Sequence, residues 1–232
     1  MPDTFHKAQP DTLFSASLLA AVGGLLDSAV FVLHGHVFAN ALTGNVILFG
    51  ITLVQQNYAQ SLRHLAPILA FIFGVAASRL LRVRPQFQAS LAVLILEMVV
   101  LFLAGLTPPA FPETIFTATI AFVSAFQVST FRTVGRFSYN STFVTGNVRE
   151  ISEGIANRFL HPDPEVRRHE FTKARKLTII CVLFLAGALL GAWAAPHFGN
   201  KALWLAEPLL LVTLARVLWL QAHPLLEPES EE

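Results

Sequence analysis

Asn40-Ala-Leu-Thr43-Gly44-Asn45 is the stretch that decides the fold, because a longer version of it recurs in the second half of the chain as Asn140-Ser-Thr-Phe-Val-Thr145-Gly146-Asn147. Each copy follows an apolar stretch that carries one polar residue near its middle, Asp27 in the first and Gln127 in the second. A duplicated half in a strongly apolar chain is typical of membrane proteins whose site lies between the two halves.

Composition indicates an integral membrane protein. Of the 232 residues, 54% are hydrophobic and 13% are charged, whereas about 25% of the residues of globular proteins are charged. The net charge of +1 offers no bulk electrostatic attraction to nucleic acid, so we expect no nucleic-acid partner. Cys181 is the single cysteine, which excludes an internal disulfide and a thiolate metal cluster.

Gaps in the charge pattern predict membrane-spanning helices, since a span requires about 20 mostly apolar residues. The six predicted spans are Phe14–Val37, Leu62–Leu81, Phe87–Leu106, Ile115–Val134, Leu177–Pro196 and Ala202–Gln221. We therefore expect an all-α, polytopic membrane helix bundle that forms a single integral domain over residues 1–232. The second span is the weakest, because Arg63 and Arg79 would have to extend to the interface from its ends.

Positive residues orient these predicted helices. They cluster between the second and third spans and between the fourth and fifth, at Arg79, Arg82, Arg84, Arg136, Arg149, Arg158, Arg167, Arg168, Lys173, Arg175 and Lys176. Loops rich in lysine and arginine remain on the cytoplasmic side of a membrane. This rule places both termini in the cytoplasm, including an acidic tail over residues 222–232.

With this orientation the two halves form a 3+3 inverted repeat, about residues 13–106 and 114–221. Three spans per half is an odd number, so the second half enters the membrane from the opposite side. Glu97 in the third span and Glu207 in the sixth occupy matching positions. Inverted repeats of this kind are a transporter architecture with its site near the membrane midplane. A duplication retained only for packing is the alternative.

The twin motifs open two further helices that do not suit a span. Residues 41–56 form a short apolar segment, and residues 141–159 carry charges that lipid would reject. We interpret both as partial or re-entrant helices whose first turns present unpaired N–H groups to an anionic or hydrogen-bonding substrate. The substrate-binding residues predicted there are Thr43, Asn45, Thr145 and Asn147. A tight helix contact with glycine as a spacer is one alternative, and eight full spans are another.

Several of these stretches resemble the YoaK-like family of bacterial inner-membrane proteins. They are Gly24 to Ser28, Phe38-Ala-Asn40, Thr43-Gly44-Asn45, Ala125-Phe-Gln127 and Thr145-Gly146-Asn147. The resemblance covers about residues 13–220. It implies a multi-pass protein of the bacterial inner membrane, in contact with the lipid bilayer, whose function is uncharacterised. His34 and His36 depart from the apolar residues that are usual there.

Acidic residues within the predicted spans are the mechanistic clues. A charge at mid-span costs about 2.5–3.5 kcal/mol, so Asp27 is a candidate proton carrier that would line a central site with Gln127. Glu97 and Glu207 are predicted to relay protons or to act as a gate. The alternatives are that Asp27 only forms a hydrogen bond across the bundle and that the two glutamates are neutral packing anchors.

Known enzyme motifs such as Gly-x-Ser-x-Gly and His-Glu-x-x-His do not occur in the sequence, so we expect no catalytic residues, no metal and no cofactor. The leading hypothesis is a transporter or permease for an unknown small solute, coupled to protons, with the homo-oligomeric state left open. A non-transport scaffold or sensor is the alternative. Convergence of Asp27, Asn45, Gln127 and Asn147 on one cavity would favour transport, and a sealed arrangement would favour the alternative.

Overall fold

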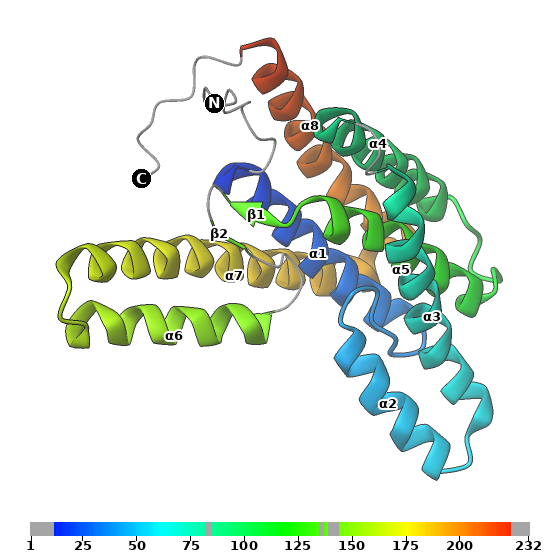
Figure 1. Cartoon of the computed structure of the whole chain (residues 1–232). Helices are drawn as coiled ribbons and strands as arrows, with labels where there is room; N and C mark the ends of the chain where they lie inside the picture. The colour runs from blue at the N-terminus through cyan, green and yellow to red at the C-terminus, as the bar shows by residue number, and fades with distance from the viewer. Residues whose placement is uncertain (1–11, 82–84, 135–136, 139–143, 224–232) are drawn as a thin grey trace.

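The computed structural model describes residues 12–81, 85–134, 137–138 and 144–223, and helices make up nearly all of the regular structure there (Figure 1). The elements are α1 Leu13–Leu33, α2 Leu42–Val54, α3 Tyr58–Leu81, α4 Gln86–Gly105, α5 Glu113–Thr130, β1 Thr133–Val134, β2 Phe137–Ser138, α6 Val144–Leu160, α7 Pro164–Phe198, the 3-10 helix η1 Gly199–Ala206 and α8 Glu207–Ala222. The two strands form a short antiparallel ribbon. A helical fold is thus confirmed, with the ribbon as an addition that the sequence did not predict.

Helices occupy all the predicted spans and both predicted partial helices. By length and composition, four stretches of the described residues could cross a membrane, namely Leu13–Leu33, Tyr58–Leu80, Gln86–Gly105 and Pro164–Ala222. The last of these runs through α7, η1 and α8 and is 59 residues long, which exceeds the roughly 20 residues of a single span. The chain is therefore a multi-pass helical protein by these criteria, while the number of spans stays a prediction.

The predicted ends of the first and fourth spans are wrong for local reasons. Helix α1 stops at Leu33 because Gly35 and His36 adopt left-handed backbone conformations, with φ of 64° and 59°, and such residues terminate helices. Helix α5 stops at Thr130, and the chain then turns into β1. The first span is thus shorter than the sequence predicts.

The helices that contain the last two predicted spans begin at other positions than those spans. Helix α7 begins at Pro164, well before the predicted start, because the side chain of Asp163 accepts the N–H of Glu165 at 2.8 Å and caps the first turn. The last predicted span begins as the 3-10 helix η1. It becomes α-helical only at Glu207, where Pro208 occupies the first turn.

Close helix pairs relate the two halves of the chain. Helix α1 packs most extensively on α7, and α3 packs on α5; α2 lies along α3, and α6 lies along α7 (Figure 1). Glycines permit both main contacts. A Cβ atom on Gly24 would lie 2.0 Å from the carbonyl oxygen of Phe184, and one on Gly74 would lie 2.5 Å from that of Phe122. Small residues let helix backbones approach this closely in membranes.

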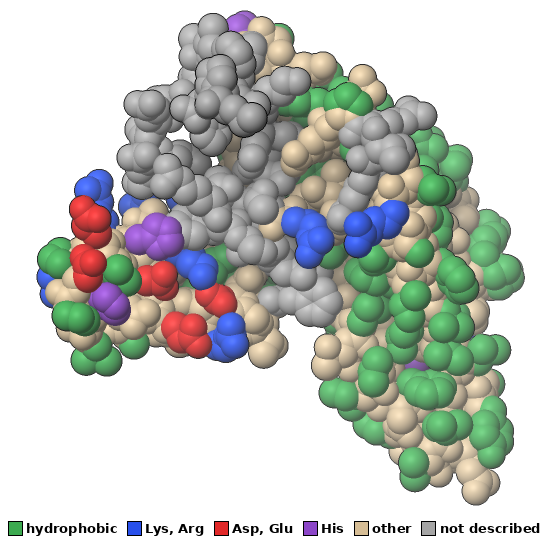
Figure 2. Space-filling view, viewed as in Figure 1, with side chains coloured by type: hydrophobic (Ala, Val, Ile, Leu, Met, Phe, Trp, Pro, Cys, Tyr) green, Lys and Arg blue, Asp and Glu red, His purple; other side chains and the backbone are tan. Residues whose placement is uncertain are grey.

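The buried core lies among α1, α4, α5, η1 and α8, and it includes Leu26, Leu94, Leu101, Ile120 and Leu210. Much of the outer surface is hydrophobic. Figure 2 shows green side chains over α2 and α3, whereas charged side chains gather on the hairpin formed by α6 and the first part of α7. Extended exposed apolar surface of this kind indicates contact with lipid.

The glycine contact between α1 and α7 makes a testable prediction. In Gly187→Ala the new Cβ would lie 1.9 Å from the carbonyl oxygen of Ala21, so the helices must move apart. We expect a loss of about 1–3 kcal/mol, typical of overpacking, measured as a lower thermal unfolding midpoint in detergent. Gly50→Ala is the control, because its Cβ would meet nothing within 4 Å. Equal midpoints for the two variants would contradict the account.

Candidate functional site

Asp27 holds the loop that leads into α2. Its side chain is 5% exposed, and Oδ1 accepts the backbone N–H groups of Asn40 at 2.6 Å and Ala41 at 3.2 Å. These residues immediately precede α2, so the carboxylate of Asp27 occupies N–H groups near the helix start that is predicted to bind a substrate. Oδ2 has no hydrogen-bond partner among the described residues. In this conformation Asp27 fastens α1 to the start of α2.

In the first Thr-Gly-Asn motif, the side chain of Asn45 holds the loop before α2 in place. Its side chain is fully buried; Oδ1 accepts the N–H of Phe38 at 2.9 Å, and Nδ2 donates to the carbonyl oxygen of Phe38 at 2.8 Å. The Phe38 ring also covers Gly44, where a Cβ would lie 2.7 Å from Cε2. Thr43 is exposed. The side chain of Asn45 therefore closes the loop, and its predicted role in substrate binding stays a prediction.

The second motif lies at the start of α6 and is packed differently. Asn147 is 6% exposed and hydrogen-bonds to the thiol of Cys181 on α7, whereas Thr145 is exposed. A Cβ on Gly146 would meet nothing within 4 Å. Gly135, Arg136 and Asn140 lie outside the described residues, as do Arg82, Arg84 and most of the acidic tail.

A cluster of polar side chains lies in the core between α4, α5 and α8. Glu97 is 0% exposed and Gln127 is 1% exposed. The carboxyl of Glu97 interacts with the amide of Gln127 and with the charge of Glu207, the partly buried first residue of α8. Both oxygens of Glu97, Nε2 of Gln127 and Oε1 of Glu207 lack a hydrogen-bond partner of ordinary geometry among the described residues. Because most buried polar groups have partners, this cluster requires an explanation.

The predicted site residues therefore lie in separate environments. Gln127 joins Glu97 and Glu207, Asp27 and Asn45 hold the loop before α2, and Asn147 contacts α7. Two pockets on the described surface lie elsewhere. The first is lined by Ala66, Thr114, Ile115, Ala118, Thr119 and Phe122, and the second by Val100, Leu103, Ala104, Thr107, Phe111, Phe116, Thr119 and Ile120. In this conformation Asp27, Asn45, Glu97, Gln127 and Asn147 are buried in protein, whereas Thr43 and Thr145 are exposed.

Sequence reasoning missed two parts of the polar interior. Asn40 is 1% exposed, and neither side-chain polar atom has a partner among the described residues; the position of its amide in an apolar motif is the signal that could have identified it. Nε2 of His34 lies 2.9 Å from Oδ1 of Asn200, and Nδ2 of Asn200 donates to Oγ1 of Thr107 at 3.0 Å. This chain joins the end of α1 to η1 and to the loop after α4.

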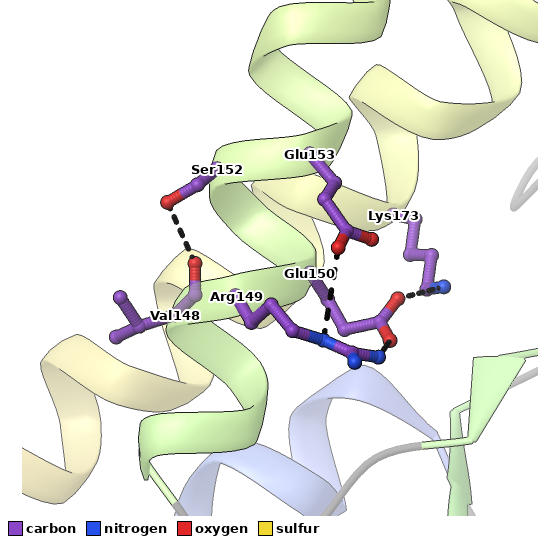
Figure 3. A network of polar contacts seen from close by, with 6 residues as sticks. All are labelled: Val148, Arg149, Glu150, Ser152, Glu153 and Lys173. Carbon is purple, nitrogen blue, oxygen red and sulfur yellow. Dashed lines mark hydrogen bonds and ion pairs between the residues drawn. The ribbon is translucent and has the colours of Figure 1, made fainter.

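An ion-pair network fastens α6 to α7 outside the core (Figure 3). Glu150 accepts a hydrogen bond from Arg149 at 3.0 Å and pairs with Lys173 of α7, while Glu153 lies 3.7 Å from Arg149. The hydrogen bond from Lys173 and then that from Arg149 hold the pKa of Glu150 below its ordinary value. The charged segment predicted as a partial helix thus forms a hairpin with α7.

Apolar helices, glycine-mediated contacts and polar residues in the core define this chain as a multi-pass helical membrane protein. Its family follows from comparison with other proteins. The family model described as "Protein of unknown function (DUF1275)" matches residues 15–216, so the chain belongs to that family. The UPF0700 transmembrane protein YoaK of Bacillus subtilis (strain 168) is 27% identical over 203 residues, covering 84% of this chain and 88% of that protein. These matches confirm the YoaK-like resemblance. No solved structure matches.

The network on α6 predicts a pH dependence. Because the pKa of folded Glu150 is lowered, its stabilising effect is complete above the unfolded value and is lost as the pH falls through the folded value. Glu150→Gln should weaken the hairpin at neutral pH by up to about 1 kcal/mol, the upper range for partly exposed ion pairs. Limited proteolysis of the hairpin should show the difference at pH 7 and lose it in strong acid. Glu153→Gln is the control, and equal cleavage of both variants at pH 7 would refute the prediction.

Proposed function

We propose that this protein is a transporter or permease for a small solute, built from two inverted repeats of three spans each, with its polar site enclosed between the halves. The single observation that carries the proposal is the cluster of Glu97, Gln127 and Glu207. Ionisable residues inside membranes are costly and commonly mark a solute or ion pathway. The first half supplies Glu97, and the second half supplies Gln127 and Glu207.

The helix pairing supports the repeat. The first helix of each half packs against the helix of the other half that contains its second predicted span, as α1 with α7 and α5 with α3. In each half that second-span helix also pairs with a shorter one. The remaining contacts of α4 with α5 and of α8 with α1 follow the same pattern. Two halves related by a twofold axis in the membrane plane would pack in this way, and transporters commonly use such an axis.

In the proposed mechanism, Asp27 is the residue that couples proton uptake to substrate binding. Its carboxylate now accepts the N–H groups of Asn40 and Ala41 at the start of α2. A substrate with an anionic or hydrogen-bonding group would compete for the same donors, since helix starts favour negative charge. Protonation of Asp27 would weaken its hold on them and release the start of α2. Proton uptake and substrate binding would then be coupled at one place.

Replacing Asp27 with asparagine tests this coupling. Asp27→Asn keeps an oxygen that can accept a hydrogen bond, so the fold should survive, but it removes the titrating group. A thermal-shift screen against small metabolites first identifies a solute, because a ligand stabilises the state that it binds. In proteoliposomes under a pH gradient, Asp27→Asn should then lose proton-driven accumulation of that solute.

Glu113→Gln is the matched control for this experiment. Glu113 lies at the first position of α5 and pairs with Arg63 at 2.9 Å, with side chains 36% and 42% exposed respectively. The same change from acid to amide should therefore leave accumulation intact. Wild-type accumulation by the Asp27→Asn variant would remove Asp27 from the mechanism.

A non-transport scaffold or sensor is the second candidate, and one observation favours it. Asp27 and Asn45 are engaged with loop backbone, and neither of the two surface pockets reaches them. A transporter in an occluded conformation would look the same. The two candidates differ in whether the core ever admits water.

A further inference from the structure

The larger of the two surface pockets is an open groove that runs along α5 beside α3. Five residues of α5 between Thr114 and Phe122 line it, and Ala66 of α3 forms its other wall. The groove offers about 380 Å³, which lies within the roughly 300–1,000 Å³ of small-molecule sites. Its surface is mostly apolar, and Ile115 is 55% exposed. Exposed apolar surface of this kind marks a binding site or a contact with lipid.

The groove lies at the depth of one membrane leaflet. The second predicted span begins at Leu62 and the fourth at Ile115, so the end of the groove near Thr114 lies at the predicted membrane surface. From Thr114 to Phe122 the axis of α5 advances by about 12 Å, at 1.5 Å a residue. One leaflet contributes about 15 Å of the hydrocarbon core. The groove therefore has the position and the length to hold part of an acyl chain, in the outer leaflet of the predicted orientation.

A cationic side chain lies at the membrane-surface end of the groove. Arg63 precedes Ala66 by one turn of α3, and its Nη1 atom lies 2.9 Å from Oε2 of Glu113, the residue before Thr114. The Arg63 side chain is 42% exposed, and Glu113 is its only polar partner among the described residues. A guanidinium carries five N–H donors, so several of those of Arg63 stay available. Arginine binds phosphate oxygens through two parallel N–H groups.

We propose that this groove binds one phospholipid, with the lipid phosphate at Arg63 and an acyl chain along α5 between Thr114 and Phe122. The pair of Arg63 and Glu113 has no net charge, so a zwitterionic headgroup meets no net repulsion there. Both parts of the ligand are required, because a partly exposed arginine alone holds an anion only weakly in water. The lipid site does not depend on the proposed transport of a solute.

A lipid chain fits the groove better than a helix of a second copy of the protein. Ala66 and Ala118 are partly buried, whereas the larger side chains of Ile115 and Phe122 are exposed beside them. Helices in membranes approach one another closely where the contact surface consists of small residues. Large side chains at the edge of the groove keep a helix backbone away, while a flexible acyl chain can lie between them.

Thermal unfolding in detergent tests the inference without a transport assay. Purified protein, stripped of co-purified lipid, is titrated with palmitoyl-oleoyl phosphatidylethanolamine. Two further titrations use palmitoyl-oleoyl glycerol, which has the same chains without the phosphate, and glycerol phosphate, which has no chains. We expect only the phospholipid to raise the unfolding midpoint saturably, because a ligand stabilises the state that it binds.

Two arginine variants test the phosphate contact. Arg63→Gln should raise the phospholipid concentration for a half-maximal effect at least about tenfold, the change expected when a hydrogen bond to a charged group is lost. Arg79→Gln is the matched control, because Arg79 is an exposed arginine in the last turn of the same helix, and it should leave that concentration unchanged.

A groove variant keeps the test decisive if Arg63→Gln fails to fold. Ala118→Leu fills the groove and leaves Arg63 in place, so it should abolish the effect, whereas Ala76→Leu, at an exposed position of α3 outside the groove, should retain it. Equal stabilisation by the phospholipid and by palmitoyl-oleoyl glycerol would overturn the inference, as would an unchanged response in Arg63→Gln and Ala118→Leu. So would a dimer that native mass spectrometry detects and Ala118→Leu dissociates, since a second copy would then occupy the groove.

Discussion

The close backbone contact of α1 with α7, matched by that of α3 with α5, is the constraint on which the rest of the structure depends. Helices in lipid gain no hydrophobic energy from meeting one another, so they associate through tight packing and hydrogen bonds. Gly24, Gly187 and Gly74 bring these pairs to backbone contact. Each pair joins the first half of the chain to the second. The two halves are therefore interlocked, and the core polar groups lie between them.

The two halves share a helix order but differ in chemistry. Asp27 fastens the start of α2 through backbone N–H groups, and its counterpart Gln127 instead meets Glu97. Gly44 lies beneath the Phe38 ring, while Gly146 is open. Helix α2 is apolar and α6 carries the ion pairs of Figure 3. The short helices of the two halves therefore suit different surroundings, α2 an apolar one and α6 an aqueous one.

Apolar runs and charge gaps were sufficient to place the apolar helices, because lipid-facing helices need long uncharged stretches. Their ends were less predictable. The left-handed residues Gly35 and His36 end α1, and the cap at Asp163 starts α7 inside a charged segment that resembled a connector. Matching positions in the two halves of the sequence are the basis on which Glu97 and Glu207 are predicted to be site residues. The partners of Asp27 and Asn45 could not be predicted, since both bind backbone groups whose position depends on a loop fold that leaves no pattern in the sequence.

Water access to the core tests the central claim most directly. Cys181 is the single cysteine, so a Cys181→Ser background allows one thiol to be placed at Gln127 and, as a control, another at Leu94, which is fully buried in the same core. Our account predicts that a hydrophilic, membrane-impermeant thiol reagent modifies the cysteine of Gln127→Cys in native membranes, because the halves open, and leaves that of Leu94→Cys unmodified. Equal protection of both thiols, applied from either side of the membrane, would contradict the claim that the polar core opens to water.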